Sequence, residues 1–219
     1  MTRSTLVRGV AFVSLAALLL VIGAALRPLI APTAPAVADP ILSATEVGFA
    51  ADMAAHHQQA MQMVQRLDPG ADPGIVALAR QIHDTQSVEI GMLLGWLRLA
   101  DASPTNRDPM AWMAADAAAA HHHPAPAGAA DPPLGPMPGM ATMTELDALS
   151  AARGREAEVL FLQLMYRHHQ GGVAMAQAAD AILTGGPVKQ AARDMMATQS
   201  QEAGLMGVLL AQRGGHPTP

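Results

Sequence analysis

The sequence contains no cysteine and very few aromatic residues. Without cysteine the chain forms neither a disulfide nor a thiolate metal site, and it lacks the attachment residue of a lipoprotein. Any soft metal would therefore need histidine or methionine ligands. Aromatic residues make up 3% of the chain, whereas it holds 15 methionines and much alanine. A core of leucine, methionine and closely packed alanine is typical of helices, so we predict an all-helical protein.

Basic residues are also scarce. Beyond residue 38 the chain has 10 lysines and arginines against 18 acidic residues, a net charge of about −8 with histidine neutral. Nucleic acid is not an expected partner, because binding phosphates requires a basic surface. The sequence has no serine-nucleophile motif and no phosphate-binding glycine loop. We therefore expect a binding protein and not an enzyme.

The N-terminus has the pattern of an export signal. Two arginines precede an apolar run over 10–26, and the small-residue site Ala36-Val37-Ala38 follows. We predict a signal peptide over 1–38 and a single secreted or extracytoplasmic domain over 39–219. The apolar run has 17 residues, at the lower limit for spanning a bilayer, so an uncleaved N-terminal membrane anchor is the alternative.

The rest of the chain repeats one motif. Glu-Val-x-Phe-x-x-x-Met-x-x-His-His-Gln begins at Glu46 and again at Glu158, and a Thr-Gln-Ser segment recurs in the same order after each copy. Such a repeat predicts a duplicated helix hairpin. We place the hairpins at 43–100 and 145–213, joined by a long Pro-, Gly-, Met- and His-rich crossover over 101–144. Two hairpins joined in this way predict a ferritin-like four-helix bundle.

Helix-start and helix-stop signals divide each hairpin. Ser43 and Glu46 form a capping-box pattern, and Asp72-Pro73 is a typical helix start. Glycine and proline pairs separate the later helices. The helices expected from these signals cover about 43–67, 72–100, 155–183 and 187–213, with shorter helices from Glu145 and around 110–120.

Helical periodicity places polar side chains inside the bundle. His56 and His168 fall on the inward stripes, and counting from the hairpin turns puts them level with Glu89 and Glu202, together with two glutamines. His57 and His169 are the next residues along each helix and therefore lie just beside these stripes. A buried polar layer is costly unless its groups bond one another, water or a metal.

The duplicated histidines predict a metal site, for which a buried His–Glu hydrogen-bond layer is the plain alternative. Imidazole and thioether ligands favour copper, as Cu(I) or Cu(II), over hard cations, and zinc or iron are alternatives. In the crossover, Met137, Met140 and Met143 at three-residue steps suit Cu(I), and His121-His122-His123 suits Cu(II) or zinc unless it is simply part of an Ala/His-rich linker. The predicted bundle ligands are Met53, His56, His57, Glu89, Met165, His168, His169 and Glu202.

The two motifs, the Pro138-Gly139-Met140 turn and Gln86-x-x-Glu89 resemble the DUF305 family of exported bacterial proteins over about 43–213. The resemblance implies a ferritin-like four-helix bundle, and some members of the family are associated with copper binding and copper tolerance. Glu158 stands where the family more often has aspartate, and Ala157 where it often has an aromatic residue. Neither change touches a His-His pair.

These observations predict an extracytoplasmic metal-binding protein, with copper binding and copper tolerance as the expected function. One rival is a ferritin-like dimetal oxidoreductase. That class needs Glu-x-x-His motifs, and none of the six glutamates has histidine three residues later. The other rival is a metal-free interaction module with a protein partner of unknown identity.

Overall fold

The computed structural model describes residues 3–30, 40–113 and 137–217. The chain divides into two units, Met1–Asp39 and Pro40–Pro219. The first unit contains helix α1, Arg3–Ile30. In the described ranges no helix is both long and apolar enough to cross a membrane. The predicted cleavage site at Ala36-Val37-Ala38 and the His121-His122-His123 run lie outside the described residues.

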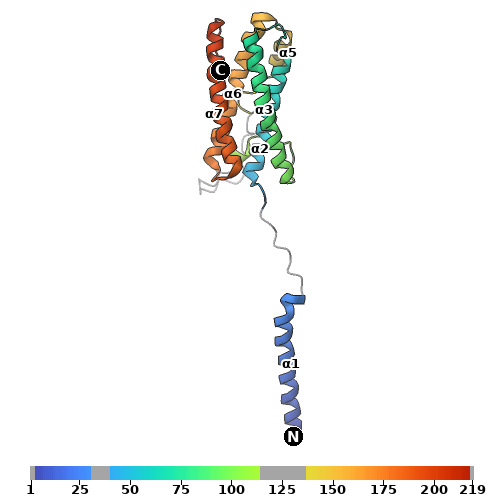
Figure 1. Cartoon of the computed structure of the whole chain (residues 1–219). Helices are drawn as coiled ribbons and strands as arrows, with labels where there is room; N and C mark the ends of the chain where they lie inside the picture. The colour runs from blue at the N-terminus through green and yellow to red at the C-terminus, as the bar shows by residue number, and fades with distance from the viewer. Residues whose placement is uncertain (1–2, 31–39, 114–136, 218–219) are drawn as a thin grey trace, which may run out of the picture. The chain divides into compact units, whose positions relative to one another are not determined.

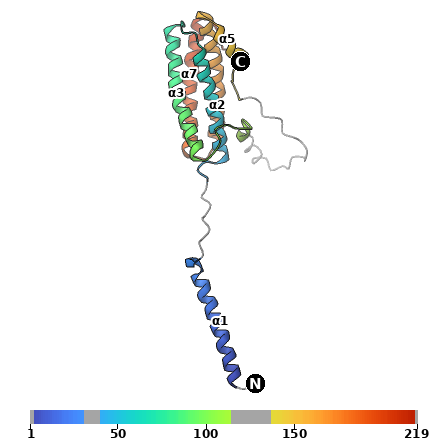
Figure 2. The ribbon, with the colours of Figure 1, turned by 90° about the vertical axis from the view of Figure 1, so that its right-hand side faces the viewer.

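In its described residues the second unit has four long helices that lie side by side as a bundle (Figures 1 and 2). They are α2 (Ala44–Arg66), α3 (Pro73–Leu99), α6 (Gly154–Ile182) and α7 (Gly186–Gln212), and a short helix, α5 (Met143–Ala151), precedes α6. Consecutive helices form the hairpins α2–α3 and α6–α7, and the hairpins meet along α2 and α6. The short helix α5 packs on α2 and α6. The residues that the structure describes contain no strand, so the all-helical prediction is confirmed.

The helices begin where their capping residues predict. Ser43 and Glu46 form a complete capping box at the start of α2, and the Asp72 side chain accepts a hydrogen bond at the start of α3. These side chains satisfy backbone amides that have no partner inside the helix. Helix α5 has its own capping box, formed by Thr142 and Glu145, which the sequence interpretation did not identify.

The bundle core consists of two apolar clusters. The first gathers the N-terminal half of α2, the C-terminal half of α6 and the adjoining halves of α3 and α7. The second gathers the opposite halves of the same four helices together with α5. The buried polar residues around His56 and His168 come from the middle of the helices, between the two clusters. Helix packing therefore holds a polar layer between the two apolar clusters.

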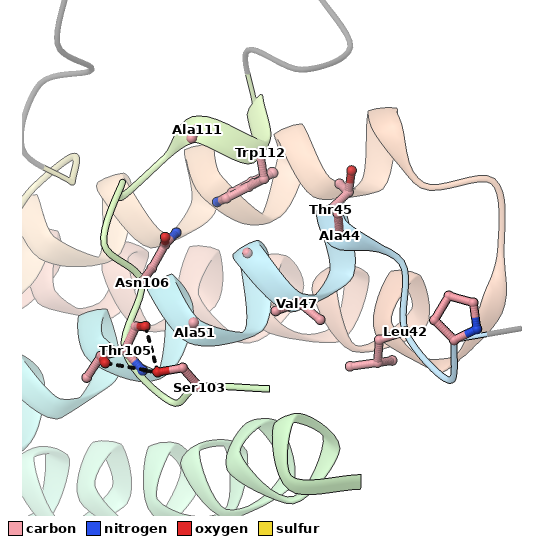
Figure 3. A pocket seen from close by; sticks show the side chains of 12 residues that line it. Leu42, Ala44, Thr45, Val47, Ala51, Ser103, Thr105, Asn106, Ala111 and Trp112 are labelled. Atoms are coloured by element: carbon pink, nitrogen blue, oxygen red, sulfur yellow. Dashed lines mark hydrogen bonds between the residues drawn. The ribbon is translucent and has the colours of Figure 1, made fainter. Parts of the chain in front are cut away.

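The segment after α3 folds back onto the start of α2. The buried carboxylate of Asp52 accepts hydrogen bonds from Asn106 Nδ2 at 3.0 Å, Met110 N at 2.7 Å and Trp112 Nε1 at 2.9 Å. A helical turn begins at 111, and the rest of the helix expected around 110–120 lies outside the described residues. Beside this segment is a groove of about 550 Å³, lined among others by Leu42 and Trp112 (Figure 3).

Candidate functional site

The polar layer brings both histidine pairs into the core. His56, His57, His168 and His169 have no solvent exposure. Gln86 and Gln199 are each 1% exposed and Glu202 is 3% exposed. His57 and His169, which the periodicity puts one position outside the inward stripe, are thus as buried as their neighbours. Each of them faces the other helix of its own hairpin, His57 toward Glu89 of α3 and His169 toward Glu202 of α7.

The first histidine of each motif lies where α2 meets α6. The His56 and His168 rings stack with centroids 3.8 Å apart. His168 Nε2 lies 3.0 Å from the backbone oxygen of His56, and His56 Nε2 lies 3.0 Å from that of Pro138. A carbonyl oxygen only accepts hydrogen bonds, so each Nε2 carries the proton and donates it. In both neutral rings Nδ1 then keeps its lone pair, and neither Nδ1 has a hydrogen-bond partner.

The second histidine of each motif contacts a glutamate. His57 Nε2 lies 2.7 Å from Glu89 Oε2, and His169 Nε2 lies 2.8 Å from Glu202 Oε2. Periodicity placed the glutamates level with His56 and His168 without assigning them partners, and the structure pairs them with the adjacent residues His57 and His169. The helical rotation of one residue is about 100°, which turns the second histidine of each motif toward its own hairpin partner and the first toward the other hairpin.

Burial keeps the stacked rings neutral. Loss of solvation, and then the charge of neighbouring His57, lowers the pKa of His56 to about 3. Burial, followed by the neighbouring His56, lowers the pKa of His168 well below its ordinary value. An imidazolium in this layer would be poorly solvated and would lie close to other histidines. Both rings are therefore neutral at pH 7, which is the form of imidazole that ligates metals.

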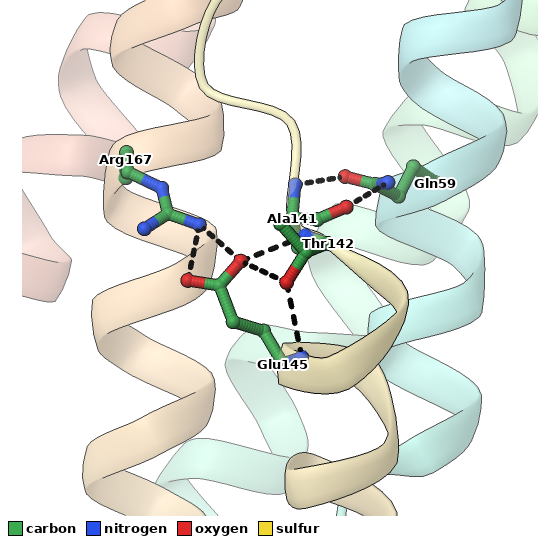
Figure 4. Close-up of polar contacts among 5 residues, drawn as sticks. All are labelled: Gln59, Ala141, Thr142, Glu145 and Arg167. Carbon is green, nitrogen blue, oxygen red and sulfur yellow. Dashed lines mark hydrogen bonds and ion pairs between the residues drawn. The ribbon is translucent and has the colours of Figure 1, made fainter.

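The end of the crossover and the first residues of α5, together residues 137–145, lie against this layer, and we call them the strap. The side chain of Gln59 makes two hydrogen bonds with the backbone of Ala141, Ala141 N donating at 2.6 Å and Ala141 O accepting at 2.8 Å. Arg167 donates to both carboxylate oxygens of Glu145, each at 2.8 Å (Figure 4). These contacts attach the strap to α2 and to α6.

Two glycines let the strap approach α6 closely. Gly139 has φ of +76°, and a Cβ there would overlap the backbone oxygen of Arg167. A Cβ at Gly171 would overlap the carbonyl group of Pro138, the group that accepts the His56 hydrogen bond. The repeated motif by itself gave no role to Gln59 or Gly171. Their signal is the one difference at the end of the repeated motif, His-His-Gln-Gln in the first copy and His-His-Gln-Gly in the second.

The predicted methionine ligands lie in different surroundings. Met53 is fully buried in the first apolar cluster, and Met165 is fully buried in the second. In the strap, Met137 is half-buried against the first cluster, whereas Met143 is the first residue of α5 and 63% exposed. Met140 is half-buried. Within the described part of the chain, no three His, Asp or Glu side chains converge as a ready metal-binding group.

Fold and site together define an all-helical bundle protein with a buried histidine layer between duplicated hairpins. The sequence matches the family described as "Domain of unknown function (DUF305)" over residues 46–210. The chain belongs to the DUF305 family, as the sequence motifs predicted.

Solved structures agree with this assignment. The chain is 37% identical to a Streptomyces coelicolor protein described as "putative secreted protein DUF305", with a TM-score of 0.67 over 80% of this chain and 96% of that one. It is 26% identical to a DUF305 fragment from Deinococcus radiodurans, with a TM-score of 0.59 over 78% of this chain and 97% of that one. No curated protein matches the chain.

Proposed function

We propose that this protein binds copper outside the cytoplasm through the polar layer of its bundle. One observation carries the proposal. In the described part of the chain, all nine buried side-chain nitrogen and oxygen atoms that lack a hydrogen-bond partner belong to this layer. They come from His56, His57, Gln86, Glu89, His168 and Gln199. Burying unpartnered polar atoms costs about 1–3 kcal/mol each, and a bound ion or its water ligands would offset that cost.

The free atoms have the chemistry of metal ligands. The Nδ1 lone pairs of His56 and His168 are unused, because Nε2 of each ring donates to a carbonyl oxygen. Neutral imidazole suits copper, zinc and iron alike, and thioethers shift the preference toward copper. Met53 and Met165 lie at comparable positions on opposite sides of the layer, one in each apolar cluster. The mixture of imidazole and thioether groups therefore favours copper over zinc and iron.

An extracytoplasmic location fits the same proposal. The N-terminal sequence has the pattern of an export signal, and the related Streptomyces coelicolor protein is named a "putative secreted protein". The chain has no cysteine, so its copper ligands would not be lost to oxidation into disulfides in an oxidising compartment.

Metal titration of the whole chain tests the proposal. We expect saturable copper binding that is tighter than binding of Zn(II) or Fe(II). His56→Gln and His168→Gln retain an amide that can donate in place of Nε2 but remove the Nδ1 lone pair, so each should weaken copper binding by about tenfold or more. His83→Gln is the matched control, because that histidine is exposed on α3.

The proposal is wrong if the parent chain shows no saturable copper binding, or if the folded His56→Gln and His168→Gln variants bind copper as tightly as His83→Gln. Tighter binding of zinc or iron than of copper would contradict the choice of metal. Circular dichroism of every variant establishes that the fold is retained.

A further inference from the structure

The two His–Glu pairs of the layer come from the same motif but differ in their bonding. In the second hairpin both ring nitrogens of His169 are used, because Nδ1 lies 3.0 Å from the backbone oxygen of Met165 and Nε2 makes a hydrogen bond to Glu202 at 2.8 Å. In the first hairpin neither ring nitrogen of His57 has a hydrogen-bond partner. His57 Nε2 is near Glu89 Oε2, but the contact is outside hydrogen-bond geometry.

The pairs also differ in their access to solvent. The Glu89 side chain is 14% exposed, whereas that of Glu202 is 3% exposed and also accepts a hydrogen bond from Gln81 at 3.3 Å. The His57–Glu89 pair therefore opens toward the surface and carries a carboxylate that attracts cations. The His169–Glu202 pair is closed and saturated.

A neighbouring position also offers a possible metal ligand in the first hairpin and none in the second. Met61 lies four residues after His57, on the same face of α2, and Val173 occupies the equivalent place after His169. Met61 is half-buried, and its sulfur accepts a hydrogen bond from Ser87 on α3 at 3.6 Å, so its thioether lies at the contact between α2 and α3. Long side chains on a helix lean toward its N-terminus. For Met61 that is the direction in which His57 lies.

We infer that copper is bound toward one side of the layer, where His57, Glu89 and Met61 of the first hairpin add their donor atoms to those of His56 and His168, while the His169–Glu202 pair of the second hairpin serves as a structural hydrogen bond. This inference rests on the proposed copper function. Metal bonds to nitrogen and oxygen of about 2.0–2.2 Å place adjacent ligands about 3 Å apart. Both His–Glu distances, 2.7 Å in the first hairpin and 2.8 Å in the second, are close to that spacing. The unpartnered His57 nitrogens and the greater exposure of Glu89 therefore single out the first hairpin.

Matched variants of the two hairpins test the inference in the whole chain. His57→Gln and Glu89→Gln remove donor atoms on the open side, and His169→Gln and Glu202→Gln make the same changes on the closed side. We expect the first pair to weaken copper binding by about tenfold or more, and the second pair to change it by less than about threefold. The titration uses Cu(II), and Cu(I) under reducing conditions, with circular dichroism to select folded variants.

The thioether is tested separately, because replacing a buried histidine can prevent folding. Met61→Leu keeps the side-chain volume and removes sulfur, so it should weaken Cu(I) binding, whereas Val173→Met should not strengthen it. Equal losses in the His57→Gln and His169→Gln variants, or equal losses in the two glutamate variants, would overturn the inference and leave the copper function standing. Absence of copper binding by the parent chain would overturn both.

Discussion

At the scale of single residues, the two hairpins differ most informatively at the residue that follows the repeated motif. Gln59 in the first copy bonds the strap through its side chain, and Gly171 in the second copy makes room for it. The same point in the repeat thus provides a hydrogen-bonding group on α2 and an empty space on α6. The two hairpins are therefore not equivalent toward the strap, which bonds to α2 and packs closely on α6.

Replacing Gly171 by alanine should lower the free energy of unfolding. The added Cβ would overlap the carbonyl group of Pro138 and would push the strap away from His56. Overpacking of this kind costs about 1–3 kcal/mol. Urea denaturation of the variant and the parent measures the change.

Gly204→Ala is the matched control for this measurement. Gly204 lies inside α7, and a Cβ there would meet no atom within 4 Å. Alanine is the better helix former, so this variant should gain about 0.5–1 kcal/mol. A Gly171→Ala protein as stable as the Gly204→Ala protein would show that Pro138 does not press against α6.

At the scale of elements, the strap and α5 form a unit that is attached to both hairpins. Glu145 caps α5 and binds Arg167 of α6, while Ala141 is held by α2. The three strap methionines belong to this unit, and of these Met143 is exposed while Met137 packs against the first apolar cluster. A Cu(I) site made of thioethers would therefore be distinct from the histidine layer against which the strap lies.

The strap methionines are predicted to hold their own Cu(I) ion. Replacing Met137, Met140 and Met143 together by leucine keeps the bulk of the side chains and removes the sulfur ligands. The triple variant should bind less Cu(I) per chain than the parent, measured by competition with a colorimetric Cu(I) chelator, and should keep the copper bound by the histidine layer.

The control for the strap variant replaces methionines elsewhere in the bundle. Met92 and Met196 are half-buried against the first apolar cluster and lie outside the strap. Their leucine variants should bind as much Cu(I) as the parent. The strap site would be disproved by a triple variant whose Cu(I) stoichiometry equals that of this control.

At the scale of the whole molecule, the buried histidines link folding to pH. The folded-state pKa of His56 is about 3, and burial lowers that of His168 as well, whereas both side chains titrate near 6.5 when the chain is unfolded. Below pH 6.5 the unfolded chain therefore takes up protons that the folded chain excludes. The stability due to neutral His56 and His168 is complete above pH 6.5 and is lost as the pH falls toward 3.

We predict that the free energy of unfolding decreases below pH 6.5 by up to about 1.4 kcal/mol per pH unit for each of these histidines. Urea denaturation between pH 7.5 and 5.0 measures the slope. The Glu158 carboxyl group affects the stability only at lower pH. Burial would raise the pKa of Glu158, but the Arg213 hydrogen bond and other favourable contacts outweigh it, and the net pKa lies below 4.5.

Single variants assign the slope to a residue. His56→Gln keeps a donor for Pro138 and removes the titrating group, so it should flatten the dependence of stability on pH by about half of the combined histidine effect. His83→Gln should leave the slope unchanged, since His83 is exposed. The other ionisable members of the layer, His57, His169, Glu89 and Glu202, are the same in both variants. An unchanged slope for His56→Gln would refute the link between this ring and acid instability.

Much of the fold is determined by local chemistry that can be read along the chain. The capping box at Ser43 and the Asp72-Pro73 start lie where the helices begin, because a cap depends only on residues within one turn. The duplicated motif and the inward stripe likewise predicted a buried layer containing His56 and His168. Helical periodicity suffices for this, since it sets which side chains share a face.

The partners of those side chains depend on how the helices pack. Periodicity placed His56 level with Glu89, but the structure pairs Glu89 with His57, because α2 turns its second histidine toward α3 and its first toward α6. The unequal bonding of His57 and His169 and the approach of Pro138 to Gly171 likewise involve residues far apart in sequence. Such contacts arise only when the rotation, separation and register of whole helices are set together, and periodicity within one helix specifies none of these.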